Sequence, residues 1–362
     1  MFTIDFALLS DEQLRSLCAQ KLLQDLSSWE LKIWSFLAQW LDPDVPGITV
    51  HTSGSTSAPR PFTHTKASMQ ASAGATCRFL AITEGKTALL ALPADKIGGM
   101  MMVVRSWLYK LRLICIAPSA NPCKDLPMDA KVDFAAFTPM QIVPAIESYN
   151  LYKRAEAIGV ILLGGSDVPH GLEHWIKSMT NRVYATFGMT ETVSHIALKK
   201  LNPPEADAHF RLVPGVDIST DERGCLQITA PALALHNLQT NDVVRLTGPD
   251  SFDWLGRYDN VINTGGLKVY PEVLESELKD AVLVPFFIAG VPDGVTGEKV
   301  VMVIERDTIT EKELDLTRNY LQQLNKTTRP RQLLIVPRFV KTETGKIKRK
   351  ESLARVDACF DL

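Results

Sequence analysis

The sequence predicts an α/β fold divided into two domains of unequal size. From residue 47 to about residue 200, short β-rich runs alternate with helical stretches, as they do around a largely parallel sheet. The length of 362 residues exceeds what one hydrophobic core usually organises. Residues 256–266 are polar and glycine-rich, which suits a hinge between domains. We therefore expect a large N-terminal domain at 1–256 and a small C-terminal domain at 257–362.

A helical block precedes the alternating region. Ser10 with Gln13, and Ser27 with Glu30, have the spacing of capping boxes, in which each side chain bonds the backbone N–H of the other residue. Leucines follow both boxes at helical spacing, and Pro43 ends the block because proline cannot continue a helix. Two consecutive helices are therefore expected before the first β-rich run.

The remaining elements are expected from periodicity and from turn residues. In the alternating region, strands are expected at 48–52, 88–92, 113–116, 132–137, 160–163 and 183–186. Helices between these strands are expected at 66–80, 141–149 and 172–179. Beyond residue 200 the run 226–229 has the pattern of an antiparallel strand. In the C-terminal unit we expect helices at 271–279 and 311–324 and a strand at 300–304.

The composition is that of an ordinary soluble globular protein. A net charge of -2 gives no reason to expect nucleic acid as a partner. The N-terminus lacks the basic segment of a signal peptide. The sequence also contains no run of 18 apolar residues, the length that a membrane-spanning helix needs. The six cysteines form no Cys-x-x-Cys pair, so we expect free thiols in a reducing cytoplasm and neither a disulfide framework nor a zinc site.

Four segments carry the functional signal. They are Thr-Ser-Gly-Ser-Thr at 52–56, Phe-Gly-Met-Thr-Glu at 187–191, Gly-Arg-Tyr-Asp at 256–259 leading into Thr-Gly-Gly at 264–266, and Thr-Gly-Lys-Ile at 344–347. Together and in this order they resemble the adenylate-forming acyl-CoA synthetases, which join a carboxylic acid to AMP and then pass the acyl group to a thiol.

This resemblance spans residues 47 to about 351 and implies the adenylate-forming enzyme fold. That fold has a large N-terminal α/β domain and a small mobile α+β C-terminal domain. Typical members carry a longer segment before the first motif, so the large domain is expected to be truncated at its front. ATP, Mg²⁺ and CoA are the implied small molecules, together with a carboxylic acid. The resemblance does not set the oligomeric state.

The first motif resembles the nucleotide loop of the family. Small hydroxyl residues and a glycine let backbone N–H groups approach phosphate oxygens, although a Ser/Thr-rich turn alone is most often a solvated loop. Two positions depart from the family pattern, because Ser57 replaces a glycine and Arg60 replaces a lysine. The resemblance implies phosphate contacts from Thr52, Ser53, Gly54, Ser55, Thr56 and Arg60.

Two further turns are implied to hold the nucleotide. Gly164, Gly165 and Ser166 follow a buried strand and would border the adenine, although a Gly-Gly pair there is by itself only a turn. Phe187, where tyrosine is common in the family, would stack on the adenine beside Gly188.

The phosphates and the ribose have their own implied partners. Thr190 would contact the α-phosphate, and Glu191 would hold Mg²⁺, because a hard cation takes carboxylate and phosphate oxygens. Asp242 would accept the ribose hydroxyls, although Asn241 stands where the family has glycine. Arg257 would make a second ribose or phosphate contact.

The family rotates its small domain between two half-reactions, and this rotation assigns further residues. Asp259 occupies the hinge position beside the Gly-Arg pair. Gly265, Gly266 and Lys268 lie on the segment that would face the site after rotation and line the path of CoA. Lys346 would serve adenylation as a cation aimed at the oxygens where charge develops, an effect worth about 3–4 kcal/mol in comparable sites.

The acid is indicated by two segments. Residues 190–197 and 96–105 resemble stretches of the o-succinylbenzoate–CoA ligases of menaquinone synthesis, the second resembling the short ligases. One carboxylate of this diacid is activated and the other must be recognised, and arginine suits bidentate recognition. Arg105, Ser194 and His195 are therefore the candidate acid-binding residues. The methionines at 100–102 are expected to pack in the core.

Several alternatives remain open from the sequence. The same chemistry on another aryl or aliphatic acid would use the same motifs. An enzyme that loads a carrier protein is a second alternative, although no segment resembles a carrier domain. A degenerate nucleotide-binding protein without turnover is a third. Retention of Glu191, Asp242, Arg257 and Lys346 argues against this last interpretation.

Overall fold

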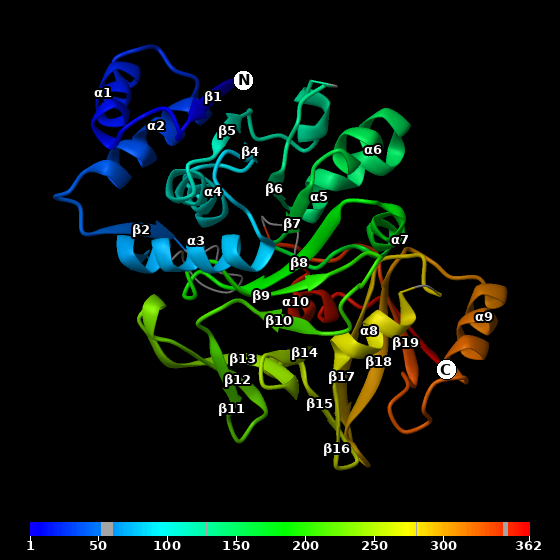
Figure 1. Cartoon of the computed structure of the whole chain (residues 1–362). Helices are drawn as coiled ribbons and strands as arrows, with labels where there is room; N and C mark the ends of the chain where they lie inside the picture. Colours follow the sequence, from blue (N-terminus) through cyan, green and yellow to red (C-terminus); the bar gives the residue numbers. More distant parts are fainter. Residues whose placement is uncertain (52–60, 128, 280, 343–346) are drawn as a thin grey trace.

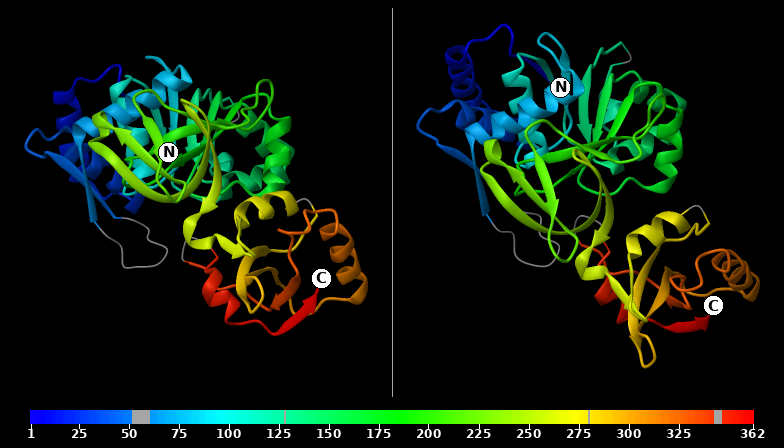
Figure 2. Two further views of the ribbon diagram at one scale, coloured as in Figure 1. Left: turned by 90° about the horizontal axis from the view of Figure 1, so that it is seen from below. Right: turned by 60° about the horizontal axis from the view of Figure 1, so that its bottom comes forward.

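The computed structural model describes residues 1–51, 61–127, 129–279, 281–342 and 347–362. Within these residues the chain forms two lobes, each built around its own β-sheet (Figures 1 and 2). The sheet of the large lobe has twelve strands, and the sheet of the small lobe has six. The fold is therefore the expected α/β fold with a large N-terminal and a small C-terminal part. The boundary between 1–256 and 257–362 stays a prediction.

The N-terminal block begins with β1 (Phe2–Asp5), α1 (Asp11–Leu22) and α2 (Ser28–Leu41). Both expected capping boxes are present. Ser10 N–H donates to Gln13 Oε1 at 2.9 Å, and Ser27 N–H donates to Glu30 Oε2 at 3.2 Å. The sequence analysis did not expect β1, which pairs with β5 of the main sheet and so attaches the block to the large lobe.

Five parallel strands form one half of the large sheet. They are β4 (Thr87–Leu90), β5 (Arg112–Cys115), β6 (Phe134–Phe137), β7 (Val160–Leu163) and β8 (Arg182–Gly188), and their order in the sheet is β5-β4-β6-β7-β8. All five lie where strands were expected. Their sequences are almost entirely apolar because both faces of a parallel sheet are covered by helices.

Alternate residues of these strands face two different hydrophobic cores. On β7, Val160 and Leu162 pack in one core and Ile161 and Leu163 in the other, as the period of two in a strand requires. The first core is covered by α3 (Lys66–Leu80) and α4 (Ile97–Leu108). The second is covered by η1 (Pro122–Asp125), α5 (Pro139–Ile142), η2 (Val143–Glu147), α6 (Tyr149–Glu156) and α7 (His170–Ser178). The result is a three-layer arrangement.

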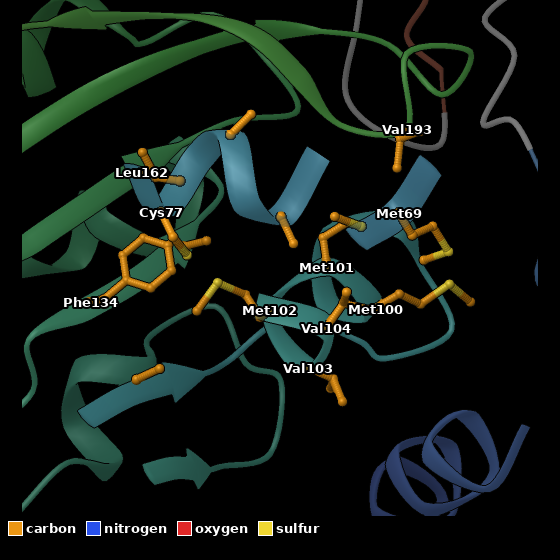
Figure 3. Packing of buried hydrophobic residues seen from close by; sticks show 14 of the residues in the cluster. Met69, Cys77, Met100, Met101, Met102, Val103, Val104, Phe134, Leu162 and Val193 are labelled. Carbon is orange, nitrogen blue, oxygen red and sulfur yellow. The ribbon is translucent and has the colours of Figure 1, made fainter. Parts of the chain in front are cut away.

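The methionine run of α4 belongs to the first core, as expected. Met100, Met101 and Met102 are buried, and Figure 3 shows them beside Met69 and Cys77 of α3. Unbranched thioether side chains fill irregular space between two helices well. This packing fixes the rotation of α4 about its axis.

One local expectation was wrong, and one expected strand lies outside the main sheet. The single helix expected at 141–149 is instead α5, η2 and the start of α6. Pro144 lies in this stretch and has no N–H to donate along a continuous α-helix. The strand expected at 48–52 exists as β2 (Gly47–His51), but it pairs only with β3 (Pro61–Thr65) in a separate hairpin within the described residues.

The other half of the large sheet is antiparallel, so "largely parallel" describes only β4 to β8. It runs from β8 through β9, β10, β14, β13 and β12 to β11, and β12 contains the antiparallel run expected at 226–229. The strands are β9 (His195–Lys200), β10 (Phe210–Leu212), β11 (Asp217–Thr220), β12 (Cys225–Ala230), β13 (Leu235–Gly248) and β14 (Ser251–Arg257), with η3 (Pro231–Leu233) between β12 and β13.

The small lobe follows η4 (Tyr258–Asn260). Its strands are β15 (Ile262–Thr264), β16 (Leu267–Val269), β17 (Phe286–Asp293), β18 (Gly297–Glu305), β19 (Gln332–Val336) and β20 (Ala358–Asp361). Its helices are α8 (Pro271–Leu278), α9 (Glu311–Leu321) and α10 (Arg349–Leu353). The helices expected at 271–279 and 311–324 and the strand expected at 300–304 are confirmed.

A side-chain contact joins the two lobes. Lys279 Nζ, just after α8, lies 2.5 Å from Glu173 Oε2 of α7 (Figure 1 shows the two helices).

All six cysteines are free thiols, as expected. Among the described residues, no helix is both long enough and apolar enough to cross a membrane.

Candidate active site

A cavity of about 1950 Å³ opens at the carboxyl ends of the parallel strands. In open α/β sheets ligands bind at this edge, because the loops that follow the strands converge there. The cavity extends to the antiparallel strands β13 and β14 and to the small lobe, where α8 lines it. Both lobes therefore contribute side chains to one site.

The turn after β7 gives the cavity a wall of small residues. Gly164, Gly165 and Ser166 line it directly beyond the strand. Gly165 has φ of +91°, and a Cβ on Gly164 would lie 2.6 Å from Thr186 Oγ1 of the neighbouring strand. Only glycine fits these two positions without strain, so the backbone is open to a flat ligand.

The tight turn between β8 and β9 supplies Thr190 and Glu191, which line the cavity at its tip. Thr192 braces the turn, because its hydroxyl accepts from Met189 N–H at 3.0 Å and donates to Ser194 O at 2.6 Å. Val193 is held at φ of +65°, an uncommon conformation for a β-branched residue. Such strain is found where the surrounding structure imposes a particular backbone path.

Phe187 forms an aromatic wall of the same cavity. Its ring lies 5.7 Å from Phe210 and 5.1 Å from Phe252, measured between centroids. Packing on two sides holds the ring in one orientation while part of it remains exposed to the cavity.

A carboxylate from the antiparallel part of the sheet also lines the cavity. Asp242 of β13 is paired across the sheet with Arg257 of β14. Its Oδ1 accepts from Trp254 Nε1 at 3.0 Å, and its Oδ2 accepts from Arg257 Nη1 at 3.1 Å. Each carboxylate oxygen has a second lone pair, so Asp242 can still accept two hydroxyl groups from a ligand.

The deep end of the cavity holds a buried cation. Arg105 of α4 is only 2% exposed, and its Nη2 donates to Thr76 Oγ1 at 3.3 Å and to Ser194 Oγ at 3.1 Å. Burial lowers the pKa of Arg105 to about 10, which leaves it charged at neutral pH. His195 Nε2 lies 2.9 Å from the same Thr76 hydroxyl. Burial, with a smaller effect of Arg105, lowers the pKa of His195 well below its usual value, so the imidazole is neutral.

Among the described residues, no carboxylate lies within ion-pair distance of Arg105. Its Nε atom is buried without a hydrogen-bond partner. A desolvated charge is costly unless an opposite charge compensates it. The deep end of the cavity therefore has the chemistry of an anion site closed by neutral hydrogen-bonding groups.

Comparison with known proteins identifies the family. A family model described as AMP-binding enzyme matches residues 8–220, more than half of the chain. The chain belongs to the AMP-binding enzymes. The large cavity is thus the candidate active site of an AMP-binding enzyme.

Two sets of similar proteins narrow this result. Curated relatives include the 2-succinylbenzoate–CoA ligase of Lactococcus lactis, 25% identical over 291 residues, covering 73% of this chain and 61% of that ligase. The corresponding ligase of Listeria monocytogenes is 24% identical over 352 residues, covering 90% of this chain and 73% of that ligase. This chain thus spans less than two thirds of the Lactococcus ligase.

Solved structures agree with the fold. The acyl-CoA synthetase (AMP-forming)/AMP-acid ligase II-like protein of Dyadobacter fermentans is 33% identical, covers 98% of this chain and 99% of its own, and has a TM-score of 0.65. The o-succinylbenzoate–CoA synthetase of Bacillus subtilis, in complex with its acyl-adenylate intermediate, is 21% identical with a TM-score of 0.67. The match covers 84% of this chain and 68% of that one.

The structure brings most of the candidate residues of this AMP-binding enzyme to one cavity. Those that line it are Arg105, Gly164, Gly165, Ser166, Phe187, Gly188, Thr190, Glu191, Ser194, His195, Asp242 and Arg257. Their roles remain predictions. The phosphate loop at 52–60 and Lys346 lie outside the described residues, but Ile347, the residue after Lys346, lines the cavity.

Four candidates lie away from the cavity in this arrangement of the lobes. Gly265 and Gly266, both with positive φ, make the two-residue turn of the β15–β16 hairpin, and Lys268 is exposed on β16. Asp259 is exposed in η4 and accepts a long hydrogen bond of 3.4 Å from Asn241 Nδ2. Their expected roles in a hinge and a CoA path depend on a second arrangement.

Sequence reasoning missed two residues that organise the site. Thr76 connects Arg105 with His195, and Trp254 orients Asp242. Thr76 lies in the middle of an ordinary helix, so no local signal identifies it. Trp254 lies two residues before the recognised Gly-Arg pair, and only the β13–β14 register directs its indole to Asp242.

The residues present fit Mg²⁺ bound together with a nucleotide. Within the described parts of the chain, no three His, Cys, Asp or Glu side chains gather to hold a metal ion alone. Mg²⁺ is commonly held by one or two carboxylates together with substrate phosphates. Glu191, at the tip of a turn in the cavity, suits this mode.

Proposed function

We propose that this protein is an AMP-forming acid–CoA ligase that acts on o-succinylbenzoate. In the first step a carboxylate oxygen of the acid attacks the α-phosphorus of ATP, which gives the acyl-adenylate and releases pyrophosphate. In the second step the thiol of CoA attacks the acyl carbon, which gives the thioester and releases AMP. Membership of the AMP-binding enzymes supports the first step, and the names of the similar ligases support both.

Arg105 carries the proposal for the acid. A diacid keeps one carboxylate while the other is activated, and the buried guanidinium lacks an anionic partner among the described residues. Ser194 offers a hydroxyl beside it at 3.1 Å. A neutral His195 adds no second positive charge, so the site suits one carboxylate better than a phosphate. The distance along the cavity from Arg105 to Glu191 would set which carboxylate reacts.

The remaining residues would act on the nucleotide. Phe187 would stack on the adenine beside the turn at 164–166, and Asp242 would accept the ribose hydroxyls. Thr190 would donate to the α-phosphate. Glu191 would hold Mg²⁺, which when bound neutralises charge on the leaving pyrophosphate.

The loop at 52–56 and Arg60 would cradle the phosphates. Lys346, which precedes the cavity-lining Ile347 in the sequence, would stabilise the charge that develops during adenylation.

The second step needs a different arrangement of the site, because a cation bridging the acid and the phosphate would obstruct the thiol. We propose that the unit 257–362 rotates about Asp259 as a small domain relative to 1–256. Gly265, Gly266 and Lys268, which are exposed on a hairpin, would then line the path of CoA.

The decisive experiment measures pyrophosphate release by the purified protein with ATP, Mg²⁺ and o-succinylbenzoate, with and without CoA. A panel of aryl, aliphatic and dicarboxylic acids is run beside it. Turnover with o-succinylbenzoate and formation of its CoA thioester are expected. Turnover with another acid alone would keep the reaction and discard this substrate. No pyrophosphate with any acid would leave a nucleotide-binding protein without turnover.

A further inference from the structure

A second, smaller cavity lies beside the acid end of the active site. Its volume is about 140 Å³, and it is bounded by α3, by η3 and by the loop that follows β10. Most of its wall is apolar, with Ala71, Ala75, Val213, Val216 and Leu233 among the lining residues. The space equals that of four or five water molecules, enough for several carbon atoms of a ligand.

His195 is the boundary between the two cavities. Among the described residues, it alone lines both the large cavity and the small one. In the large cavity it adjoins Arg105 and Ser194, the proposed receptors of the second carboxylate. The small cavity therefore begins where the bound acid would end.

Hydrogen bonds on both sides hold the imidazole in this position. One assignment of protons satisfies the whole group: Thr76 Oγ–H donates to Ser72 O at 3.1 Å, and His195 Nε2–H donates to Thr76 Oγ1 at 2.9 Å. Ser194 Oγ–H then donates to His195 Nδ1 at 3.4 Å, and Arg105 donates to both hydroxyl oxygens. A ring with both nitrogens engaged cannot swing aside without breaking these bonds.

We propose that His195 is a specificity-determining residue: its ring closes the acid pocket and separates it from a reserve apolar space that would otherwise admit longer acids. This inference rests on the proposed function in one respect, namely that the acid lies against Arg105. It goes further, because it assigns the upper limit of acid length to one side chain and identifies the space behind it.

The test compares binding of a homologous series by wild type, His195→Ala and His195→Gln. The series is o-succinylbenzoate and analogues whose acyl arm is one, two or three methylenes longer, titrated by calorimetry in the presence of a non-hydrolysable ATP analogue. Wild type is expected to lose affinity as the arm lengthens. His195→Ala is expected to gain about fourfold per added methylene that enters the small cavity, so at least tenfold over wild type for the longest acid. His195→Gln keeps most of the side-chain volume and an amide N–H, so it should still lose affinity as the arm lengthens.

A second substitution locates the gained space. Ala75→Leu, on the wall of the small cavity, should abolish the gain when combined with His195→Ala. Ala67→Leu, exposed on the same helix, is the matched control and should preserve it. Melting temperatures confirm that each variant folds. If His195→Ala does not fold, His195→Val, which removes less of the ring volume, replaces it.

The outcomes separate this inference from the proposed function, because binding requires no turnover. Tighter binding of long acids by His195→Ala supports the inference even if no acid releases pyrophosphate. The inference is overturned if wild type and His195→Ala discriminate equally between short and long acids, or if neither binds any acid. If wild type also turns over o-succinylbenzoate in that case, the proposed function stands and only the role of His195 is rejected. A gain that survives Ala75→Leu would likewise overturn the inference.

Discussion

At the scale of single residues, the buried guanidinium of Arg105 dominates the site. The side chain is 2% exposed, and its hydrogen-bond partners are the neutral hydroxyls of Thr76 and Ser194 and, at 3.9 Å, the sulfur of Met102. Hydroxyl groups satisfy N–H donors but do not neutralise charge. A ligand carboxylate would provide both and would offset the cost of burying this cation.

Arg105→Met should therefore weaken recognition of a diacid selectively. Hydrogen bonds to charged groups contribute about 1.5–3 kcal/mol, so we expect KM for o-succinylbenzoate to rise about 10- to 150-fold. KM for ATP should change less than threefold, because Arg105 is proposed to bind the acid and not the nucleotide. Steady-state kinetics with each substrate varied in turn check this.

Two controls accompany that measurement. Arg112→Met removes an exposed arginine of β5 and should leave both KM values unchanged. A monocarboxylic analogue, which has no second carboxylate, should be affected far less by Arg105→Met than the diacid is. A diacid KM equal to that of wild type would remove Arg105 from the acid pocket.

At the scale of elements, the β8–β9 turn links the proposed nucleotide-binding residues to the proposed acid-binding residues. It carries Thr190 and Glu191 on one side and Ser194 and His195 on the other. Gly188 lets its two sides approach, since a Cβ there would lie 2.3 Å from Ser194 O and 2.5 Å from His195 Cα. The two ends of the site are thus positioned by one backbone contact.

Gly188→Ala should displace both sets of residues at once. Because misplacement by about 1 Å can cost about 100-fold in rate, we expect kcat/KM for pyrophosphate release to fall about 10- to 100-fold. Gly171→Ala on α7 is the control, because a Cβ added there would meet no atom within 4 Å and alanine favours helix. If Gly188→Ala is as active as Gly171→Ala, the two sides of the β8–β9 turn can move apart without loss of activity, and the prediction is wrong.

At the scale of the whole molecule, the cavity depends on how the two lobes meet. One side-chain link between them is the ion pair of Lys279 with Glu173, and both side chains are about one quarter exposed. Such a pair contributes only about 0–1 kcal/mol, so it can bias the arrangement without locking it. A weak contact suits an enzyme whose small domain is proposed to rotate in each cycle.

Lys279→Met should loosen the lobes without unfolding either one. We expect the melting temperature to change by no more than about 2 °C, since a single partly exposed pair contributes little. Cleavage by a protease between the lobes should become faster, which time-resolved limited proteolysis measures. Lys86→Met breaks a more exposed pair with Asp133 inside the large lobe and should not alter cleavage. Equal cleavage of both variants would show that the link is incidental.

Lys346→Ala should separate the two half-reactions. Loss of a cation aimed at developing charge is expected to slow adenylation about 10²- to 10³-fold. Thioester formation from supplied acyl-adenylate and CoA should be nearly unchanged, because the proposed second arrangement does not use Lys346. Lys350→Ala, an exposed lysine of α10, should retain adenylation. Equal loss of both half-reactions in Lys346→Ala would contradict the two-arrangement mechanism.

The elements that the sequence predicted correctly are those specified within short windows. The capping boxes at Ser10 and Ser27, the apolar runs of β6 and β7 and the helix at Lys66–Leu80 depend on neighbours a few residues away. The motifs around Glu191 and Gly256 are equally local, so family membership was recognisable from the residues alone. The prediction of one helix at 141–149 was wrong because it relied on apolar periodicity and neglected Pro144, which has no backbone N–H to donate within a helix.

The pairing of distant segments was decided by the tertiary structure alone. By itself the sequence determined the fold class, the family and a set of candidate residues, most of which, among those that the structure describes, line the cavity. It did not determine that β2 leaves the main sheet, or that Thr76 meets His195 across 119 positions. Nor did it reveal the small cavity behind His195. Contacts of this kind depend on how whole layers pack, and no local periodicity records them.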